Sequence, residues 1–261
     1  MRTIPLLATI ALTLVACGGE EESASGSEAG GAPSEPAEEI TVSAAASLTT
    51  AFEAYDERTP VTERFSFAGS DALAAQIRQG ATPDVYAAAN TELPQALFEE
   101  GEVGEPTVFV TNTLVIAVPT DSQIASIDDL TESDVDLVIG TEDVPFGSYT
   151  RTVLDRLPAG ERDAILANVR SEEPDVNSAV GKLTQGAGDA SFTYSSDVAA
   201  ASGRLRAIEL PAELQPDVAY AVAVVEGAEN PKAAQAFIDG LVSGAGAQVL
   251  QEAGFRPPPA G

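Results

Sequence analysis

The sequence predicts an α/β fold with two lobes, joined by two crossing strands that serve as a hinge. From about residue 40 onward, apolar runs with strand character alternate with segments of helical period. Two of these runs, at 111–119 and 218–227, are long and apolar, and they enclose a self-contained α/β block. A chain that leaves one lobe, builds a second lobe and returns needs two such crossings. The pattern also fits a single doubly wound domain with long central strands.

Three strand–helix units precede the first crossing run. In each unit an apolar run ends at small residues, and a helical period of apolar side chains follows. The strands are expected over 40–45, 64–68 and 84–89, and the helices from about Ser47, from Ser70 and over 93–98.

The block between the crossing runs continues this alternation. A strand at 136–140 leads into a helix with Tyr149 on its apolar face. Asp175 is a suitable cap for the next helix, which is expected to end before Gly186. A strand at 190–194 and a short helix follow.

Two helices close the chain after the second crossing run, one beginning at Pro231 and one over 245–252. They are expected to complete the lobe that the chain left earlier. The first lobe then consists of residues 40–112 and 219–261, and the second lobe of residues 113–218.

The N-terminal segment predicts export and lipid attachment. The apolar run from Ile4 to Val15 is too short to span a bilayer and is typical of a signal peptide. Leu14-Val15-Ala16-Cys17 resembles a bacterial lipobox, which predicts a signal peptide over 1–16 and a lipid on Cys17. A signal peptide with an incidental cysteine is the alternative. The acidic segment 17–39 has no large apolar side chain and is expected to be a disordered tether.

The composition argues against several classes of function. The net charge of -28, from 13 Lys+Arg against 41 Asp+Glu, disfavours nucleic acid or an anionic membrane surface as a partner. The chain has no histidine, which removes histidine general bases and histidine metal sites. Neither a G-x-S-x-G nor a Walker A sequence occurs. A hydrolase that uses Ser47 or Ser70 is therefore only a remote alternative.

Seven motifs, taken in order, resemble the molybdate-binding proteins of ABC transporters, a group within the two-lobed periplasmic-type solute-binding proteins. The motifs are "AAASLT" at 44–49, "FAGSDALAAQI" at 67–77, "TPDVYAAAN" at 82–90, "DVPFGSYT" at 143–150, "DVNSAV" at 175–180, "FTYSSDV" at 192–198 and "YAVAVVEG" at 220–227. The resemblance implies a type II periplasmic-binding-protein fold, a monomer, an ABC permease as partner and no cofactor. It also implies an extracytoplasmic protein that captures molybdate or tungstate and performs no chemistry.

Position by position, the resemblance implies five contacts to the molybdate or tungstate oxyanion. Ser47 and Ser70 would each give a hydroxyl and a backbone N–H group. Phe146 and Val176 would give backbone N–H groups only, and Tyr194 would give its phenol. The two serines belong to the first lobe and the other three residues to the second, so the anion would bridge the cleft.

The residues around these positions fit an anion site that needs no cation. Four of the five positions lie at or just before expected helix starts, where free N–H groups and the helix dipole favour anions. Small residues at 44–46 and at Gly69 leave the backbone open to a ligand. Each position also has an ordinary structural explanation. The two serines are good helix caps, Tyr194 fits a partly buried aromatic residue, and Val176 fits a first-turn apolar residue.

Two residues depart from the family pattern. Asp71 stands where small or hydroxyl residues follow the second serine, and as an acceptor it could take the proton of hydrogen phosphate. A phosphate or sulfate binding protein of the same fold is therefore the nearest alternative. Because Asp71 is one position beyond Ser70, it is expected to point away from the cleft. Phe146 replaces a small residue, so its ring either points away or narrows the pocket. A scaffold or adhesive lipoprotein, which needs no ligand cleft, is an alternative of another class.

Overall fold

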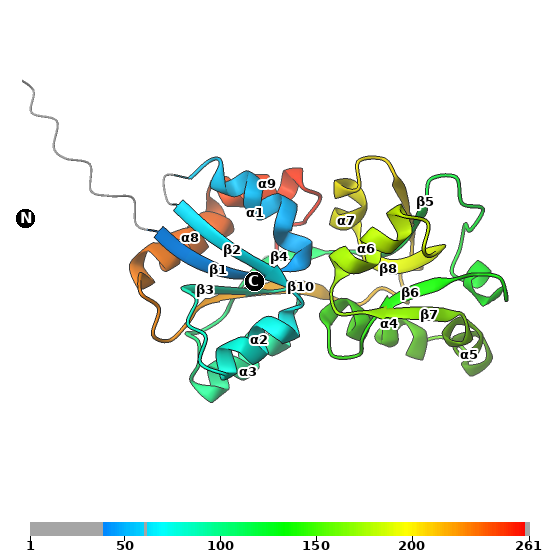
Figure 1. The fold of residues 1–261 in the computed structure, drawn as a ribbon, viewed down its shortest axis with the longest axis horizontal. Helices are drawn as coiled ribbons and strands as arrows, with labels where there is room; N and C mark the ends of the chain where they lie inside the picture. The colour runs from blue at the N-terminus through cyan, green and yellow to red at the C-terminus, as the bar shows by residue number, and fades with distance from the viewer. Residues whose placement is uncertain (1–38, 60–61, 259–261) are drawn as a thin grey trace, which may run out of the picture. The chain divides into compact units, whose positions relative to one another are not determined.

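The computed structural model describes residues 39–59 and 62–258. These residues form two lobes, each built on a five-stranded mixed sheet with helices on both faces (Figure 1). The two-lobed α/β fold that the sequence predicts is confirmed. Three predicted features lie outside the described residues: the signal peptide over 1–16, the lipid expected on Cys17 and the tether, apart from Glu39, which begins the first strand.

The sheet of the first lobe has the strand order β2-β1-β3-β10-β4. Strand β1 pairs in parallel with β2 and β3, whereas β10 is antiparallel to both β3 and β4. The strands are β1 (Glu39–Ala45), β2 (Thr62–Ala68), β3 (Val85–Ala88), β4 (Thr107–Asn112) and β10 (Val218–Val224).

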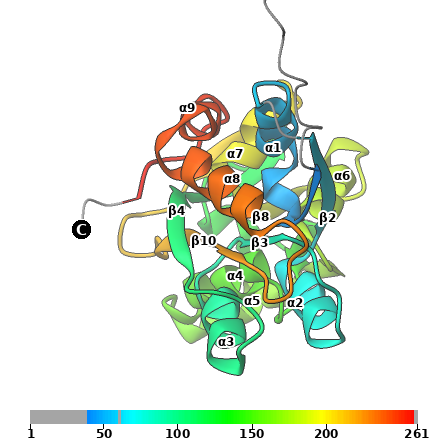
Figure 2. The same cartoon turned by 90° about the vertical axis from the view of Figure 1, so that its left-hand side faces the viewer.

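Helices cover both faces of this sheet. Helices α1, α8 and α9 lie on one face, and α2 and α3 lie on the other (Figures 1 and 2). The helices are η1 (Ala46–Leu48), α1 (Thr49–Asp56), α2 (Ser70–Arg78), α3 (Glu92–Glu100), α8 (Pro231–Ser243) and α9 (Ala245–Glu252).

The second lobe repeats this arrangement with the strand order β7-β6-β8-β5-β9. Its β6 pairs in parallel with β7 and β8, and its β5 is antiparallel to β8 and β9. The strands are β5 (Leu114–Pro119), β6 (Leu137–Gly140), β7 (Val169–Glu173), β8 (Ala190–Tyr194) and β9 (Leu205–Glu209).

Helices α6 and α7 cover one face of the second sheet and α4 and α5 the other (Figure 1). The helices are η2 (Asp128–Thr131), α4 (Pro145–Asp155), α5 (Ala159–Ala167), α6 (Val176–Thr184) and α7 (Ser195–Ala200). The central strands β3, β6 and β8 are buried along their whole length. Because both faces of these strands are covered, β3 and β6 appear in the sequence as apolar runs, whereas β8 also contains the buried Ser191 and Thr193.

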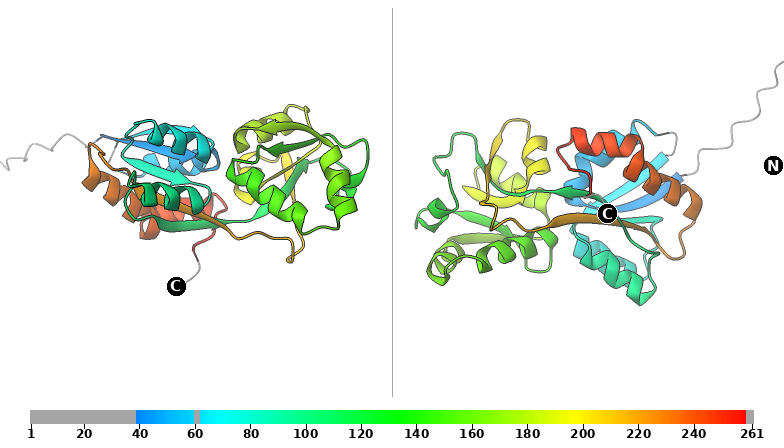
Figure 3. Two further views of the ribbon diagram at one scale, coloured as in Figure 1. Left: turned by 90° about the horizontal axis from the view of Figure 1, so that it is seen from below. Right: turned by 180° about the vertical axis from the view of Figure 1, so that it is seen from behind.

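The first crossing run is not one long strand. Strand β4 ends at Asn112 in the first sheet, and β5 begins at Leu114 in the second sheet. The side chain of Asn112 accepts the N–H of Thr113 at 2.8 Å, which separates the two strands at that residue. The chain passes between the lobes here, as Figure 3 shows from below and behind.

The second crossing run also differs from expectation. Strand β10 pairs only with β3 and β4 of the first sheet, so it belongs to the first lobe alone. The chain returns from β9 through the irregular segment 210–217. The apolar run at 218–227 therefore corresponds to β10, an interior strand of the first sheet. The return crossing itself, over 210–217, has no regular secondary structure.

The parallel strands place several strand-to-helix turns side by side. In the first lobe Ala45 is paired with Ala68, so the turns that lead into η1 and α2 begin next to each other. In the second lobe Gly140 is paired with Glu173, so the turns into α4 and α6 also begin together. Ligands of open α/β sheets bind at such carboxyl ends of strands. Both sets of turns line the contact between the lobes.

Candidate functional site

Residues from both lobes line a small cavity at the carboxyl ends of the strands. Its volume is about 20 Å³. The lining residues are Ala45, Ala46, Ser47, Ala68, Gly69, Ser70 and Ala89 from the first lobe and Val144, Pro145, Phe146, Asp175, Val176 and Tyr194 from the second. The structure thus brings all five residues singled out in the sequence around one space, although they come from five separate segments.

Ser47 lies in η1, directly after three alanines, of which Ala44 and Ala45 end β1 and Ala46 begins η1. It is 9 % exposed, and its Oγ is 2.9 Å from the phenol oxygen of Tyr220 on β10. Its hydroxyl does not cap a helix by accepting a backbone N–H of the following turn. The capping explanation for this serine therefore fails in the structure.

Ser70 is the first residue of α2 and is almost completely buried. Its Oγ accepts the backbone N–H of Ala89 at 3.1 Å, and its carbonyl accepts the hydroxyl of Tyr86 at 2.7 Å. Burial raises the pKa of Tyr86, which keeps this phenol protonated as a donor. Because Ala89 already donates to Ser70 Oγ, the proton of this hydroxyl is free for another acceptor.

Phe146 and Val176 lie in the first turns of α4 and α6. N–H groups in a first helical turn have no acceptor within the helix, so both backbones can offer donors to the cavity. The ring of Phe146 is part of the buried apolar core, and its Cε1 lies 2.8 Å from where a Cβ atom on Gly140, in the same lobe, would stand. The ring therefore packs against its own lobe, and Phe146 also lines the cavity.

Tyr194 ends β8 and precedes α7. Its backbone N–H donates to Asp197 Oδ2 at 2.9 Å, which fixes the residue at the start of the helix. Its buried phenol oxygen has no hydrogen-bond partner among the described residues, although the ring of Tyr220 lies close, with centroids 5.7 Å apart. Burial, and after it the neighbouring Tyr220, holds the pKa of Tyr194 well above its ordinary value. The phenol is therefore a protonated donor in need of an acceptor.

The cavity offers donors and no cationic side chain. No lysine or arginine is among its lining residues, and Asp175 is the charged residue among them. Both carboxyl oxygens of Asp175 accept hydrogen bonds from Ser178, one from its backbone N–H at 2.9 Å and the other from its side-chain hydroxyl at 2.8 Å. The remaining polar groups are hydroxyls and helix N-termini, which together favour an anion.

Asp71 does not line the cavity, in keeping with the sequence prediction, but its side chain lies close to Gly69 at the start of α2. One carboxyl oxygen is buried without a hydrogen-bond partner in the described part of the chain. That oxygen lies 2.7 Å from the position of a Cβ atom on Gly69, and the carbonyl of Pro174 in the second lobe lies 2.4 Å from the same position. Asp71 thus sits where the two lobes meet. Its place in the first turn of α2 is as expected.

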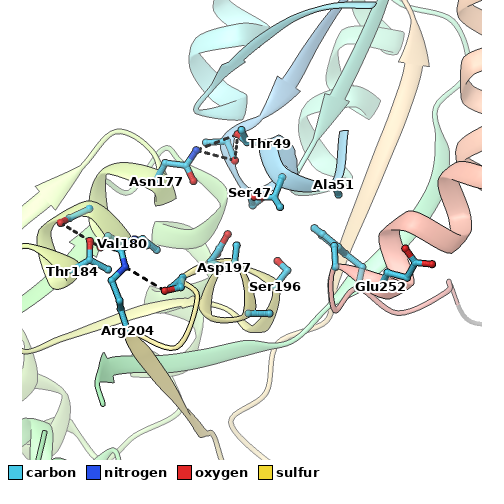
Figure 4. A pocket seen from close by; sticks show the side chains of 18 residues that line it. Ser47, Thr49, Ala51, Asn177, Val180, Thr184, Ser196, Asp197, Arg204 and Glu252 are labelled. Carbon is cyan, nitrogen blue, oxygen red and sulfur yellow. Dashed lines mark hydrogen bonds between the residues drawn. The ribbon is translucent and has the colours of Figure 1, made fainter. Parts of the chain in front are cut away.

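A second direct contact joins the lobes, and it was not predicted from the sequence. The side-chain amide of Asn177, in α6, donates to the carbonyl of Ala46 at 3.1 Å and to Thr49 Oγ1 at 3.2 Å (Figure 4). Asn177 directly follows Val176, inside the motif "DVNSAV", which is the one local signal that could have drawn attention to it. Tyr220 likewise begins the motif "YAVAVVEG".

A larger cavity of about 440 Å³ adjoins the site on the other side of Ser47. Helices α1 and α9 of the first lobe and α6 and α7 of the second line it, and Figure 4 shows Asn177, Ser196 and Asp197 at its wall. It shares Ala46 and Ser47 with the small cavity. The two lobes are therefore in contact around the small cavity and separated beside it.

Residues 39–59 and 62–258 contain no group of three or more His, Cys, Asp and Glu side chains placed to hold a metal ion. Within the same residues, no helix has the length and apolarity needed to cross a bilayer.

The fold and the enclosed cavity define the class of two-lobed proteins that bind a small solute between their lobes. The sequence profile described as "Bacterial extracellular solute-binding protein" matches residues 40–256. The chain belongs to this family.

Three similar proteins illustrate the relationship. Molybdate-binding protein ModA of Mycobacterium tuberculosis is 36% identical over 253 residues, which cover 94% of this chain and 93% of ModA. ModA of Escherichia coli is 30% identical over 230 residues, covering 83% and 88%. The solved structure of the Azotobacter vinelandii periplasmic molybdate-binding protein has a TM-score of 0.75 at 19% identity, covering 84% of this chain and 99% of that one. The resemblance seen in the motifs is confirmed.

Proposed function

We propose that this protein captures the molybdate or tungstate oxyanion between its lobes and delivers it to the permease of an ABC importer. Ser47, Ser70 and Tyr194 donate hydroxyl hydrogen bonds to the anion, and Phe146 and Val176 donate backbone N–H groups. The protein acts as a carrier and catalyses no reaction on the anion.

One observation carries this proposal: five potential donors from both lobes surround a single cavity that no cationic side chain lines. A ligand that contacts all of them draws the lobes together, because each lobe alone supplies only part of the set. The cavity is small with the lobes in contact, so the anion enters when they separate and is enclosed when they close.

The chemistry of the donors supports a fully deprotonated anion. Ser70 Oγ already accepts a hydrogen bond from Ala89, and the Tyr194 phenol oxygen has no partner, so both have protons to give. A protonated oxyanion such as hydrogen phosphate needs an acceptor as well. The names of the relatives, which are molybdate-binding proteins, support the same choice.

The same contacts argue against a hydrolase. The hydroxyl of Ser47 is paired with a phenol and that of Ser70 with a backbone N–H, so neither faces a group that would remove its proton.

The proposed site of action is outside the cytoplasm, with the protein anchored to the cell membrane by a lipid on Cys17 and acting as a monomer. The lipobox at 14–17 supports the anchor. Cys17→Ser is expected to move the protein from the membrane fraction to the soluble fraction of the cells or medium. Unchanged membrane association of that variant would contradict the anchor and leave the ligand proposal standing.

A thermal-shift series with molybdate, tungstate, sulfate and phosphate tests the ligand. At a hundredfold excess over its dissociation constant, the correct anion stabilises the folded protein by about 2.7 kcal/mol. Molybdate and tungstate are expected to raise the unfolding temperature at the lowest concentrations. A shift with phosphate or sulfate, and none with molybdate or tungstate, would contradict the assignment.

A further inference from the structure

A buried chain of hydrogen bonds runs from the hinge to the ligand cavity. It begins at Asn112, where β4 ends and the chain crosses to the second lobe. Asn112 Nδ2 is 3.5 Å from the phenol oxygen of Tyr220, and that oxygen is 2.9 Å from Ser47 Oγ. All three residues are at least nine-tenths buried.

The orientation of the Asn112 amide is fixed by its other partners. The N–H of Thr113 points to one amide atom at 2.8 Å, and an N–H can only donate. That atom is therefore Oδ1, which also accepts the hydroxyl of Ser195 at 3.0 Å. The other atom is the NH₂ group, which donates to Ser196 Oγ at 2.9 Å and faces Tyr220.

This orientation favours one direction for the next hydrogen bond. An amide NH₂ group has no lone pair to accept the phenol proton of Tyr220. Of the two side chains within hydrogen-bond distance of the Tyr220 phenol oxygen, Asn112 and Ser47, only Ser47, with its Oγ at 2.9 Å, can accept that proton. When Tyr220 donates to Ser47, the hydroxyl proton of Ser47 is left to point into the cavity.

We propose that Tyr220 is a positioning residue that makes Ser47 a fixed hydrogen-bond donor, and that it thereby selects fully deprotonated oxyanions over protonated ones. The proposal rests on the function proposed above. Tyr220 does not line the cavity and touches the ligand only through Ser47. Its hydrogen bond to Ser47 also takes up one of the two lone pairs of Ser47 Oγ, so less acceptor capacity remains for the P–O–H proton of hydrogen phosphate.

The surroundings of Tyr220 hold its hydroxyl in place. The ring is completely buried and makes edge contacts with Phe109, Tyr194 and Phe255, with centroids 6.4, 5.7 and 5.5 Å away. A phenol on such a ring has little freedom to seek another acceptor. At Ser70 the backbone N–H of Ala89 has the role that Tyr220 has at Ser47, because it donates to Ser70 Oγ. Both serines are thus made donors toward the cavity, one by the backbone and one by Tyr220.

The test measures the affinities of sulfate, molybdate and phosphate by calorimetry for the full-length protein and for Tyr220→Phe. Near pH 8 phosphate is largely HPO₄²⁻, which carries the charge of sulfate but keeps one proton. Sulfate and molybdate affinities are expected to fall about threefold to tenfold, the effect of one hydrogen bond. Phosphate is expected to lose less, because Ser47 can then accept its proton, so the phosphate-to-sulfate affinity ratio rises about threefold.

Tyr55→Phe is the matched control, since Tyr55 is a buried tyrosine of the same lobe outside this chain of hydrogen bonds. It should leave the affinity ratio unchanged. In a Ser47→Ala background, Tyr220→Phe should have no further effect on any anion, because Tyr220 acts through Ser47.

Asn112→Asp supplies a second test, because a carboxylate can accept the Tyr220 proton and turn it away from Ser47. Its added charge affects sulfate and HPO₄²⁻ equally, so the ratio should again rise. An unchanged phosphate-to-sulfate affinity ratio in both Tyr220→Phe and Asn112→Asp would overturn the role of Tyr220. The same conclusion would follow if Tyr220→Phe lowered the affinity for all anions equally, both in the parent and in the Ser47→Ala background. A parent that binds none of the oxyanions would instead overturn the proposed function.

Discussion

The backbone carbonyl of Pro174, in the second lobe, lies 2.4 Å from the position that a Cβ atom on Gly69 would occupy in the first lobe. Gly69 precedes Ser70 at the start of α2, so this contact lies beside the cavity. Backbone atoms cannot give way as the end of a flexible side chain can. The lobes come this close only because residue 69 has no side chain.

Gly69→Ala is therefore expected to hold the lobes apart. Overpacking of this kind costs about 1–3 kcal/mol, which corresponds to an affinity roughly five- to over a hundredfold weaker. Calorimetry measures the loss, and small-angle scattering with saturating anion should show a larger radius of gyration than for the parent. Gly160→Ala, in α5 where no atom lies within 4 Å of the new Cβ, is the control and should bind as the parent does. Parental affinity in Gly69→Ala would show that ligand binding does not require this contact.

Asn177 should stabilise the closed form through its two hydrogen bonds to the first lobe. Asn177→Ala removes both bonds, one of them to the backbone of Ala46. Each bond contributes about 0.5–1.5 kcal/mol, so the dissociation rate of the anion should rise roughly five- to a hundredfold with little change in the association rate. Stopped-flow measurements of both rates check this.

Asn230→Ala is the matched control for that experiment. The amide of Asn230 bonds to the carbonyl of Glu39 within the first lobe, so its loss should leave both rates unchanged. Equal rates for Asn177→Ala and the parent would indicate that this contact is not part of the ligand-bound form.

The three hydroxyls of the cavity should each contribute to affinity. Ser47→Ala, Ser70→Ala and Tyr194→Phe each remove one donor to a charged ligand, worth about 1.5–3 kcal/mol. Molybdate or tungstate affinity measured by calorimetry should fall roughly tenfold to over a hundredfold in each variant. If all three variants keep the parental affinity, these residues serve the fold and the anion binds elsewhere.

The sequence allowed the cavity-lining turns to be predicted because their signals are local. Small residues at the end of a strand, followed by a hydroxyl at a helix start, mark Ser47 and Ser70 within a few positions. Parallel pairing of β1 with β2 then brings the two turns together without any further information. Which residues contact a ligand was suggested by the family motifs and not by these patterns.

The supporting contacts could not be predicted in the same way, because their partners are remote in sequence. Tyr220 is 173 residues from Ser47, and Asn177 is 131 residues from Ala46. The edge strands β7 and β9 were also missed. Their sequences, "VRSEE" and "LRAIE", carry the charged residues that protect exposed sheet edges and weaken the apolar signal of a strand.

Asp197 should make the stability of the protein depend on pH. Burial raises the pKa of this carboxyl group to about 7, against a value of about 3.9 in an unfolded chain. Between these pH values the folded protein holds a proton that the unfolded chain releases, so the free energy of unfolding falls as the pH rises from about 4 to about 7.

Asp197→Asn removes this titration and can still accept the N–H of Tyr194 through its amide oxygen. The variant should match the parent near pH 4 and exceed its free energy of unfolding by on the order of 2–4 kcal/mol near pH 8. Urea denaturation of both proteins across this range measures the difference. Other titratable groups, such as Glu63, whose pKa is also raised to about 7, are present in both proteins. Their contribution to the pH dependence of the free energy of unfolding therefore cancels in the comparison. A difference that does not grow with pH would contradict the raised pKa.

Substitutions of Asp71 test whether the protein discriminates against phosphate. Its buried carboxyl oxygen has no partner and lies close to Gly69, as does the carbonyl of Pro174. Both oxygens are acceptors, and both lie close to the same point at Gly69, where the lobes meet beside the cavity. Asp71→Asn removes the acidic group and adds an amide donor that can bond to Pro174. We expect molybdate and sulfate to bind about threefold to tenfold more tightly, since one hydrogen bond between the lobes is gained and a repulsion is lost.

Asp71→Ser removes the acidic group without supplying an amide donor, and it should change tungstate affinity by less than about tenfold, or 1.4 kcal/mol. The order of affinities among the four anions should be the same in both variants and the parent. If the parent binds phosphate tightly and both variants lose it, then Asp71 accepts the proton of hydrogen phosphate, and the protein is a phosphate carrier.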